Sequence, residues 1–216
     1  MSKLQIIGAP QSNFVWVTRI ACEEKGIDYE LAQVMPHGPE VLGIHPLGKI
    51  PAMRHGDVLL GESRAICLYI DQNFSGPSLI PGNVAAAARV EQWISIVMTH
   101  IDPLLIRRYA ALYYFPKTPD GRPDLELIHA AVPEMRIQIS MLERAVANGF
   151  LAGDCFSLAD AYLVPVLFYM NLLPESRAML VDSPRLLAYL ERHLQRRSVA
   201  ATTAPPFPGR ELRIAS

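Results

Sequence analysis

Hydrophobic residues follow two periods in the first 75 residues and only one period after them. Short runs rich in β-branched residues, bounded by Gly or Pro, predict strands, and apolar positions spaced i, i+3, i+4 predict helices. Val17, Ile20 and Ala21 show the helical spacing, and Gly26 follows them as a C-terminal stop. The predicted elements are a strand over 3–8, a helix over 13–25, a strand over 28–34, an irregular stretch over 36–46 with one helical turn, a hairpin over 51–61 and a helix over 62–74. This order predicts a compact α/β unit with a βαβ start and an antiparallel end.

The rest of the chain has only helical patterns. The segment SGPSLIPGN is rich in Gly, Pro and Ser and reads as a linker. Two apolar stripes with helical spacing follow it, Val90-Trp93-Val97-Ile101-Leu104 and Val132-Met135-Ile139-Leu142-Val146, and Pro103 is expected to bend the first. Two further helices are predicted over 156–170 and 183–194, and the Pro-rich tail over 202–216 is expected to pack loosely. The predicted organisation is an α/β domain over 1–75, a linker over 76–82 and an all-helical domain over 83–216.

Composition excludes several classes of partner. The 216 residues carry 20 basic and 21 acidic side chains, a net charge of −1, which argues against nucleic acid or an anionic membrane as a partner. The three cysteines are odd in number and lie in apolar stretches, so they predict buried thiols in a reducing compartment. The N-terminal apolar run is too short for a signal peptide, and no segment reaches 18 apolar residues. A cytoplasmic protein without a membrane partner is expected.

Pro51 follows Ile50 at the beginning of the predicted hairpin. A trans proline would simply begin the strand. A cis bond, found in about 5–6% of X–Pro bonds in folded proteins, would instead turn the Ile50 amide and carbonyl outward. An extended peptide could then pair with these groups as an added strand. The residues alone leave both alternatives open.

Two predicted helices begin with residues that suit an acidic ligand. Ser63 could offer its hydroxyl and amide to a carboxylate, and Glu62 could accept from an ammonium group, because helix N-termini carry unpaired amides and a partial positive charge. A hydroxyl at Ser12 could donate to an anion held at the first helix. Plain helix capping explains each of these residues when it is taken alone. No His or Asp accompanies Ser12 in a triad pattern, so a nucleophilic serine is not predicted.

Motifs for other chemistries are missing from the sequence. The six histidines show no HxxxH spacing and no cysteine pair accompanies them, so no metal site is predicted. There is no GxGxxG run and no GxxxxGK[ST] run, so neither a dinucleotide site nor a P-loop is predicted.

Four stretches together resemble the cytosolic glutathione transferase family, most closely its phi class and the bacterial relatives of that class. GAPQSN followed by RIACEEKGIDYE is similar to the phi Gly-x-Pro-x-Ser loop and helix end. HPLGKIPAM is similar to the family segment whose proline is cis, and ESRAICLYI to its glutamate–serine signature. FLAGDCFSLADAYLVP is similar to a second-domain segment in which Ser157 and Asp160 form a structural capping box. Four matches in the right order are more specific than any one of them, and they favour a site over separate local explanations.

The resemblance implies a fold, a co-substrate and a set of roles. The fold would be an α/β thioredoxin-like N-terminal domain followed by an all-α C-terminal domain. Glutathione would be the co-substrate, with no metal. Ser12 would stabilise the glutathione thiolate, Ile50 and Pro51 would fix the peptide, and Glu62 with Ser63 would hold its γ-glutamyl end. The thiolate would attack an electrophilic carbon or reduce a peroxide.

Two assignments stay open within the resemblance. Lys49 is the first candidate for binding the glycine carboxylate of glutathione, and His37 is the second. Asn13 could contact the sulfur in place of Ser12, as the neighbouring residue does in some bacterial relatives. The sequence also departs from the family at His45, where an asparagine is common.

The resemblance further implies an apolar electrophile in a cleft between the domains, touching Phe14, Tyr109 and Tyr113, an assignment made from position alone. It also implies a homodimer. The alternative is a non-catalytic binding or regulatory subunit of the same fold, and Ser12 together with Glu62-Ser63 favours the enzyme. Thiol–disulfide exchange would need a cysteine at the position of Ser12, where there is none.

Overall fold

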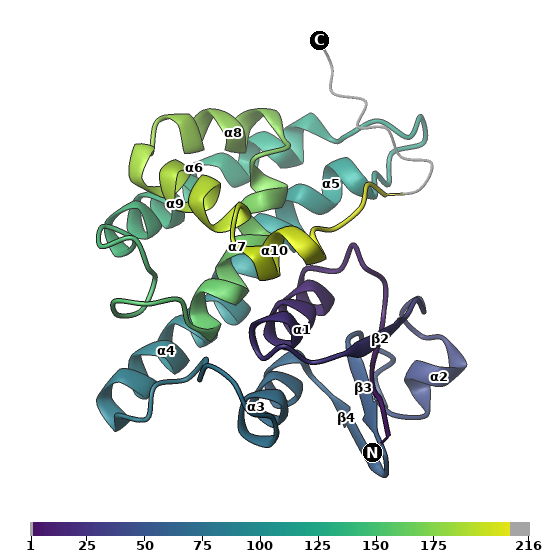
Figure 1. Cartoon of the computed structure of the whole chain (residues 1–216). Coiled ribbons are helices and arrows are strands. Elements are labelled where there is room, and N and C mark those ends of the chain that lie inside the picture. The colour runs from purple at the N-terminus through teal and green to yellow at the C-terminus, as the bar shows by residue number, and fades with distance from the viewer. Residues whose placement is uncertain (1, 208–216) are drawn as a thin grey trace. The chain divides into compact units, whose positions relative to one another are not determined.

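The computed structural model describes residues 2–207, which divide into two compact units, labelled by element in Figure 1. The first unit holds residues 2–81 together with Gln195–Pro206. The second holds Gly82–Leu194 together with Phe207. The division expected from the sequence placed all of 83–216 in one helical domain, and the structure differs from it in the segment Gln195–Pro206.

The first unit is built around a four-stranded mixed sheet in the order β2-β1-β3-β4. Strands β1 and β2 run parallel, and β3 is antiparallel to both β1 and β4. The elements follow the predicted order: β1 (Leu4–Ile7), α1 (Asn13–Glu24), β2 (Tyr29–Ala32), α2 (Pro39–Leu42), β3 (Ala52–His55), β4 (Val58–Gly61) and α3 (Ser63–Asn73). One boundary matters for the site, because α3 begins at Ser63 and Glu62 is its N-cap rather than its first helical residue.

Alternation along the central strands divides the sheet into two buried faces. Ile7 and Ala52 are paired across β1 and β3, and they pack with Val41 of α2. Ile6 and Met53 form the next pair, and both are completely buried. Because successive side chains of a strand point to opposite faces, this second pair lies on the side where α1 and α3 cover the sheet, away from α2 (Figure 1).

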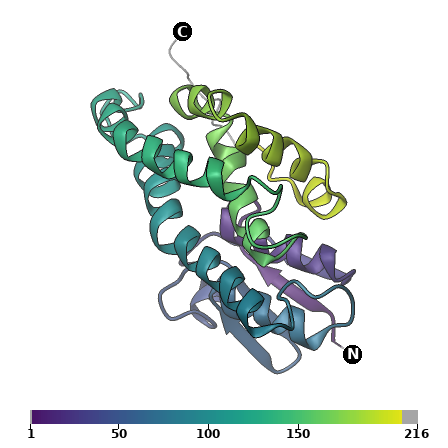
Figure 2. The ribbon, with the colours of Figure 1, turned by 90° about the vertical axis from the view of Figure 1, so that its left-hand side faces the viewer.

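The second unit is entirely helical, as predicted. Its elements are α4 (Val84–Ile96), η1 (Val97–Ala110), α5 (Ala111–Tyr114), α6 (Leu125–Ala145), α7 (Leu158–Met170), α8 (Pro174–Val181) and α9 (Pro184–Leu194). Helix α6 packs against η1, and Figure 2 shows the helices of this unit from a second side. The buried stripe of α6 differs by one position from the predicted one: Val132 is only half-buried, and Ile128 and Ala131 are buried on that face.

The segment around Pro103 is a π-helix rather than a bent α-helix. Proline has no N–H group and cannot make the i→i−4 bond of an α-helix. The i→i−5 bonding of a π-helix continues to the end of η1, where the N–H of Ala111 donates to the carbonyl of Ile106. A π-helix brings residues five apart into contact, and the guanidinium of Arg107 bonds the buried carboxylate of Asp102 at 2.9 Å.

The predicted capping box is present at the start of α7. The carboxylate of Asp160 accepts from the N–H and the hydroxyl of Ser157, at 2.9 and 3.0 Å. It also accepts from the N–H of Leu151 and the hydroxyl of Tyr189, at 2.8 and 2.9 Å. Burial and the nearby carboxylate raise the pKa of Tyr189, so its hydroxyl stays a donor. Asp160 is therefore a structural residue, as the sequence indicated.

A helix that the sequence pattern did not predict lies directly before the Pro-rich tail and includes its first residue, Thr202. Helix α10 (Arg197–Thr202) packs against α1, and the indole N–H of the completely buried Trp16 donates to the hydroxyl of Thr202 at 2.9 Å. The expectation of loose packing over 202–216 is thus wrong for Thr202, and positions 208–216 lie outside the described residues.

Candidate functional site

The register of the sheet brings four connecting segments to one end. Ile7 pairs with Ala32 in the parallel direction and with Ala52 in the antiparallel direction, and Ala52 pairs with Gly61. The chain therefore leaves β1, leaves β2, enters β3 and leaves β4 at the same end of the sheet. Every candidate residue of the first domain lies in one of these segments or in the first turn of the helix that follows. Tertiary structure thus gathers residues that are up to 51 positions apart in the sequence, from Ser12 to Ser63.

Ser12 is the N-cap of α1. Its side-chain oxygen accepts from the N–H of Val15 at 3.4 Å, which is long for a hydrogen bond, and its carbonyl accepts the first helical bond from Trp16 at 2.9 Å. Within residues 2–207 the Ser12 hydroxyl donates its proton to no protein acceptor. The capping interpretation is correct, and the hydroxyl proton is still available to an anionic ligand.

The two residues after Ser12 are placed differently from it. Asn13 is the first residue of α1 and is only 4% exposed. Phe14 is half-buried on the same helical turn. The half-buried Ser12 is therefore the more accessible of the two candidates for the sulfur contact.

The peptide bond between Ile50 and Pro51 is cis, as the resemblance predicted. Within the described part of the chain, neither the N–H nor the carbonyl of Ile50 is hydrogen-bonded. Ile50 also lies close to the start of α1, because a Cβ added at Gly8 would be 2.6 Å from Val15 and 3.0 Å from Ile50. The segment that could pair with a peptide backbone is thus next to the helix end that carries Ser12.

Glu62 and Ser63 lie at the N-terminus of α3. Glu62 has a φ of 66°, a left-handed conformation that is uncommon for a residue other than glycine, and its side chain is 60% exposed. One of its carboxylate oxygens accepts from Nε2 of His45 at 3.1 Å. Ser63 is buried as the first residue of the helix. An exposed carboxylate directly before a helix N-terminus can bind a group that is positive at one end and negative at the other.

The two candidates for the glycine carboxylate lie together. The N–H of His37 donates to the carbonyl of Gly48 at 2.8 Å, next to Lys49. A Cβ at Gly48 would overlap Nδ1 of His37, so the imidazole lies directly over the Gly48 backbone. Both His37 and Lys49 are exposed. The contact between His37 and Gly48 brings His37 and Lys49 into one corner of the first unit, and Lys49 stays the first candidate and His37 the second.

Tyr109 and Tyr113 belong to the helical unit, and both are buried. Their hydroxyls donate to the carboxylate of Glu175 at 2.9 and 2.7 Å. Burial raises the pKa of both tyrosines, so both remain protonated donors. Their expected contact with an electrophile stays a prediction, as does that of Phe14.

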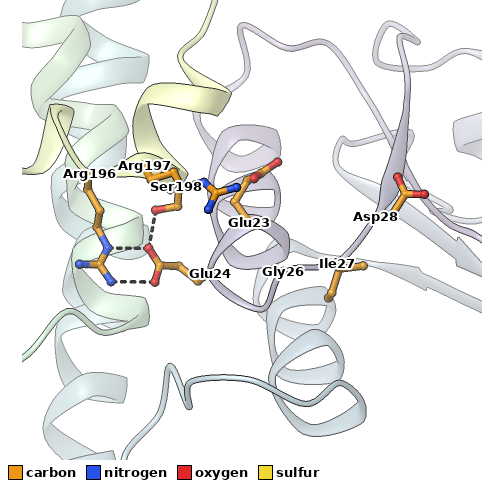
Figure 3. A pocket seen from close by; sticks show the side chains of 8 residues that line it. All are labelled: Glu23, Glu24, Gly26, Ile27, Asp28, Arg196, Arg197 and Ser198. Atoms are coloured by element: carbon orange, nitrogen blue, oxygen red, sulfur yellow. Dashed lines mark hydrogen bonds and ion pairs between the residues drawn. The ribbon is translucent and has the colours of Figure 1, made fainter.

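A polar groove of about 560 Å³ lies at the other end of α1. Figure 3 shows Glu24 within it, between Arg196 and Ser198. The guanidinium of Arg196 donates to both oxygens of Glu24, at 2.5 and 2.7 Å, and the hydroxyl of Ser198 donates to one of them. Because the 12 residues of α1 span about 18 Å, this groove is far from Ser12 along the helix axis. The bonds to Glu24 connect α10 and the residue before it to α1, and the groove is lined by none of the predicted site residues.

The sequence pattern missed the contact between His45 and Glu62. The two residues are 17 positions apart, and no spacing motif links them. The only signal was that His45 departs from the residue type common at its position.

The family model "Glutathione S-transferase, N-terminal domain" matches residues 6–78, and "Glutathione S-transferase, C-terminal domain" matches residues 127–192. The chain is 32% identical over 222 residues to glutathione S-transferase 3 of Zea mays, with 96% of this chain and 98% of that protein covered. The chain belongs to the glutathione S-transferase family.

Solved structures of glutathione S-transferases have the same fold. Glutathione S-transferase III in apo form has a TM-score of 0.82 and 30% identity, with 96% of this chain and 100% of that chain covered. Glutathione S-transferase-I bound with lactoylglutathione has a TM-score of 0.82 and 28% identity, with 94% and 99% covered. The predicted fold and the resemblance to the phi-class enzymes of plants are confirmed.

Residues 2–207 contain neither a membrane-spanning helix nor a cluster of metal-binding side chains. None of the helices in this range is long and apolar enough to cross a membrane. No three His, Cys, Asp or Glu side chains of the same range are grouped so that they could hold a metal ion.

Proposed function

We propose that this glutathione S-transferase binds glutathione at the end of the sheet where β1 and β4 end and β3 begins, and that it uses the bound thiolate as a nucleophile. The unpaired N–H and carbonyl of Ile50 support this proposal most directly. Leaving two backbone groups of one residue without partners is costly unless a ligand or water bonds them. The backbone of an extended tripeptide supplies the complementary donor and acceptor.

The remaining contacts follow from the charges of glutathione. The γ-glutamyl group carries an ammonium, which would donate a hydrogen bond to the exposed carboxylate of Glu62. It also carries a carboxylate, which would bind at the N-terminus of α3 beside Ser63. The glycine carboxylate would lie at the corner of Lys49 and His37, with Lys49 as the first candidate to bind it. This orientation directs the cysteinyl side chain toward α1, where the Ser12 hydroxyl would donate to the sulfur.

The proposed chemistry begins with ionisation of the thiol. A free thiol has a pKa of about 8.5, so only a few per cent is thiolate at pH 7. The Ser12 hydroxyl bonds the charged form better than the neutral form and therefore lowers the pKa of the thiol. In conjugation, the thiolate forms a carbon–sulfur bond, and a leaving group departs with its electron pair or the adduct takes a proton. In peroxide reduction, the thiolate attacks one oxygen, the O–O bond breaks, and the alkoxide leaves and takes a proton to become an alcohol. The thiol of a second glutathione then displaces water from the sulfenic acid to form a disulfide.

We also propose a homodimer in the cytoplasm. Cys22 and Cys67 are buried and are not joined in a disulfide, which supports a reducing compartment, whereas Cys155 is exposed and not buried as predicted. Burial raises the pKa of Cys22, which makes it unreactive.

The test of this function is retention on immobilised glutathione followed by turnover assays. We expect elution by free glutathione and activity with at least one compound in a panel of electrophiles and hydroperoxides. Binding without turnover of any compound would support the non-catalytic alternative, and failure to bind glutathione would contradict both functions.

A further inference from the structure

His45 is buried and held at three points. It is 5% exposed, and its backbone N–H donates to the carbonyl of Val41 at 2.7 Å. Its ring Nδ1 lies 3.2 Å from the backbone N–H of Leu47. A backbone amide can only donate, so Nδ1 is the acceptor. In the neutral ring the proton is therefore assigned to Nε2, and Nε2 is the donor toward Glu62.

The backbone beside Glu62 fits the imidazole closely. A Cβ added at Gly61 would lie 2.6 Å from Cδ2 of His45, so only glycine leaves room for the ring in this position. Glu62 follows with its φ of 66°, and its Oε1 is 3.1 Å from Nε2 of His45. Within residues 2–207, the second carboxylate oxygen, Oε2, has no protein partner. A side chain that is 60% exposed is thus anchored at one oxygen and open at the other.

We propose that His45 is a positioning residue for recognition of the ligand ammonium: it holds Glu62 through Oε1 and leaves Oε2 directed to the amino group of the bound peptide. This inference rests on the proposed function. An exposed glutamate samples many rotamers, and fixing one of them on binding costs conformational entropy. A hydrogen bond that orders Glu62 before the ligand arrives reduces this entropy cost of binding. The anchoring hydrogen bond is charge-assisted, which makes it stronger than a bond between neutral groups. His45 itself does not touch the ligand.

The experiment compares two ligands that differ only at the ammonium. One is glutathione, and the other is the analogue in which hydrogen replaces the γ-glutamyl amino group. We expect His45→Ala to weaken glutathione binding about 10-fold in calorimetry while leaving the affinity for the analogue unchanged. The KM for glutathione should rise by a similar factor with little change in kcat, because the thiol chemistry is at Ser12. His45→Gln, whose amide can donate to Glu62, should restore most of the affinity.

His55→Ala is the matched control. His55 is a half-buried histidine at the opposite end of β3, where it bonds the hydroxyl of Tyr69 at 2.8 Å. This variant should leave both affinities unchanged. If His45→Ala does not fold, His45→Asn replaces it, since its shorter side chain keeps a polar group in the loop but does not reach Glu62.

The outcomes separate this inference from the proposed function. Equal loss of both ligands in the His45 variant, or loss of neither, would overturn the positioning role while the wild-type protein still binds glutathione. Failure of the wild-type protein to bind glutathione would instead overturn the proposed function. Selective loss of glutathione, with rescue by His45→Gln, supports the inference.

Discussion

At the scale of single residues, Ser12 combines a structural and a chemical role in one hydroxyl. Its oxygen caps α1 through the long bond to Val15, and its proton points to no protein acceptor among residues 2–207. A two-unit fall in the pKa of a bound thiol corresponds to about 2.7 kcal/mol. One charge-assisted hydrogen bond contributes about 1.5–3 kcal/mol, so a single hydroxyl is sufficient for most of that change.

Ser12→Ala should leave glutathione bound but mostly protonated. We expect the pKa of the bound thiol to rise by about one to two units, so turnover at neutral pH falls about 10- to 100-fold. Because the thiolate is the reactive form, the rising limb of the pH–rate profile should move to higher pH, and the two proteins should converge in alkaline buffer. Ultraviolet titration of the thiolate measures the shift directly.

Asn13→Ala is the control for this titration. If the pKa follows Asn13 and not Ser12, the sulfur contact belongs to the neighbouring residue. If neither substitution moves it and turnover persists, the hydroxyl mechanism is wrong.

Gly48→Ala should weaken glutathione binding through displacement of His37. Gly48 has a φ of 64°, and an added Cβ would overlap the imidazole of His37. Gly26 has nearly the same φ, 65°, but nothing lies within 4 Å of its Cβ position. Both alanine variants should therefore lose about 1–2 kcal/mol of stability from the left-handed backbone, measured by urea unfolding. Only Gly48→Ala should also raise the Kd for glutathione. Equal Kd values for the two variants would show that the His37 corner does not contact the ligand.

At the scale of elements, helix α7 depends on one carboxylate. Asp160 is completely buried, and four protein donors converge on it from three parts of the helical unit. Removing the acceptor leaves several buried donors without partners, and each such donor costs about 1–3 kcal/mol. The Asp160 carboxylate therefore holds the start of α7 and the position of α9 together.

Asp160→Ala should lower stability by about 3 kcal/mol or more without changing the affinity for glutathione in the fraction that folds. Urea unfolding and calorimetry on the same sample measure both quantities. Tyr189→Phe is a milder companion, because it removes one donor and leaves the carboxylate with its other three bonds. Normal stability with abolished glutathione binding would place Asp160 in the ligand site instead.

At the scale of the whole molecule, each unit leaves large apolar side chains exposed. Leu47 and Leu59 are examples in the first unit, and Val84 and Ile137 in the second. Scattered exposed apolar residues are common on monomers. Pairing two copies about a two-fold axis would bury the same apolar groups on both copies.

Analytical ultracentrifugation should give a species of about twice the monomer mass of 24.0 kDa. The expected dimer should persist on dilution into the low micromolar range. A single species near the monomer mass at micromolar concentration would contradict the homodimer.

The sequence by itself determined the element order of the first 75 residues, the helical character of the second unit and the family. The strand and helix patterns of the first 75 residues and the capping box of Ser157 and Asp160 depend on neighbours a few positions away, so local spacing reports them. The cis bond before Pro51 was predicted by the family resemblance, because the residues alone left both forms open. The candidate residues also lie beside strand ends or helix N-termini, where short motifs specify the local backbone. Local physical chemistry was sufficient for these features.

Only the tertiary structure decided which distant groups meet. The hydrogen bond between His45 and Glu62 depends on how the loop before β3 passes over Gly61. The position of α10 against α1 depends on the hydrogen bond between Trp16 and Thr202, which are 186 positions apart. The meeting of His37 with Gly48 is of the same kind. No periodicity encodes such contacts, because they arise from the path of the whole chain and from which surfaces it buries, rather than from the preferences of adjacent residues.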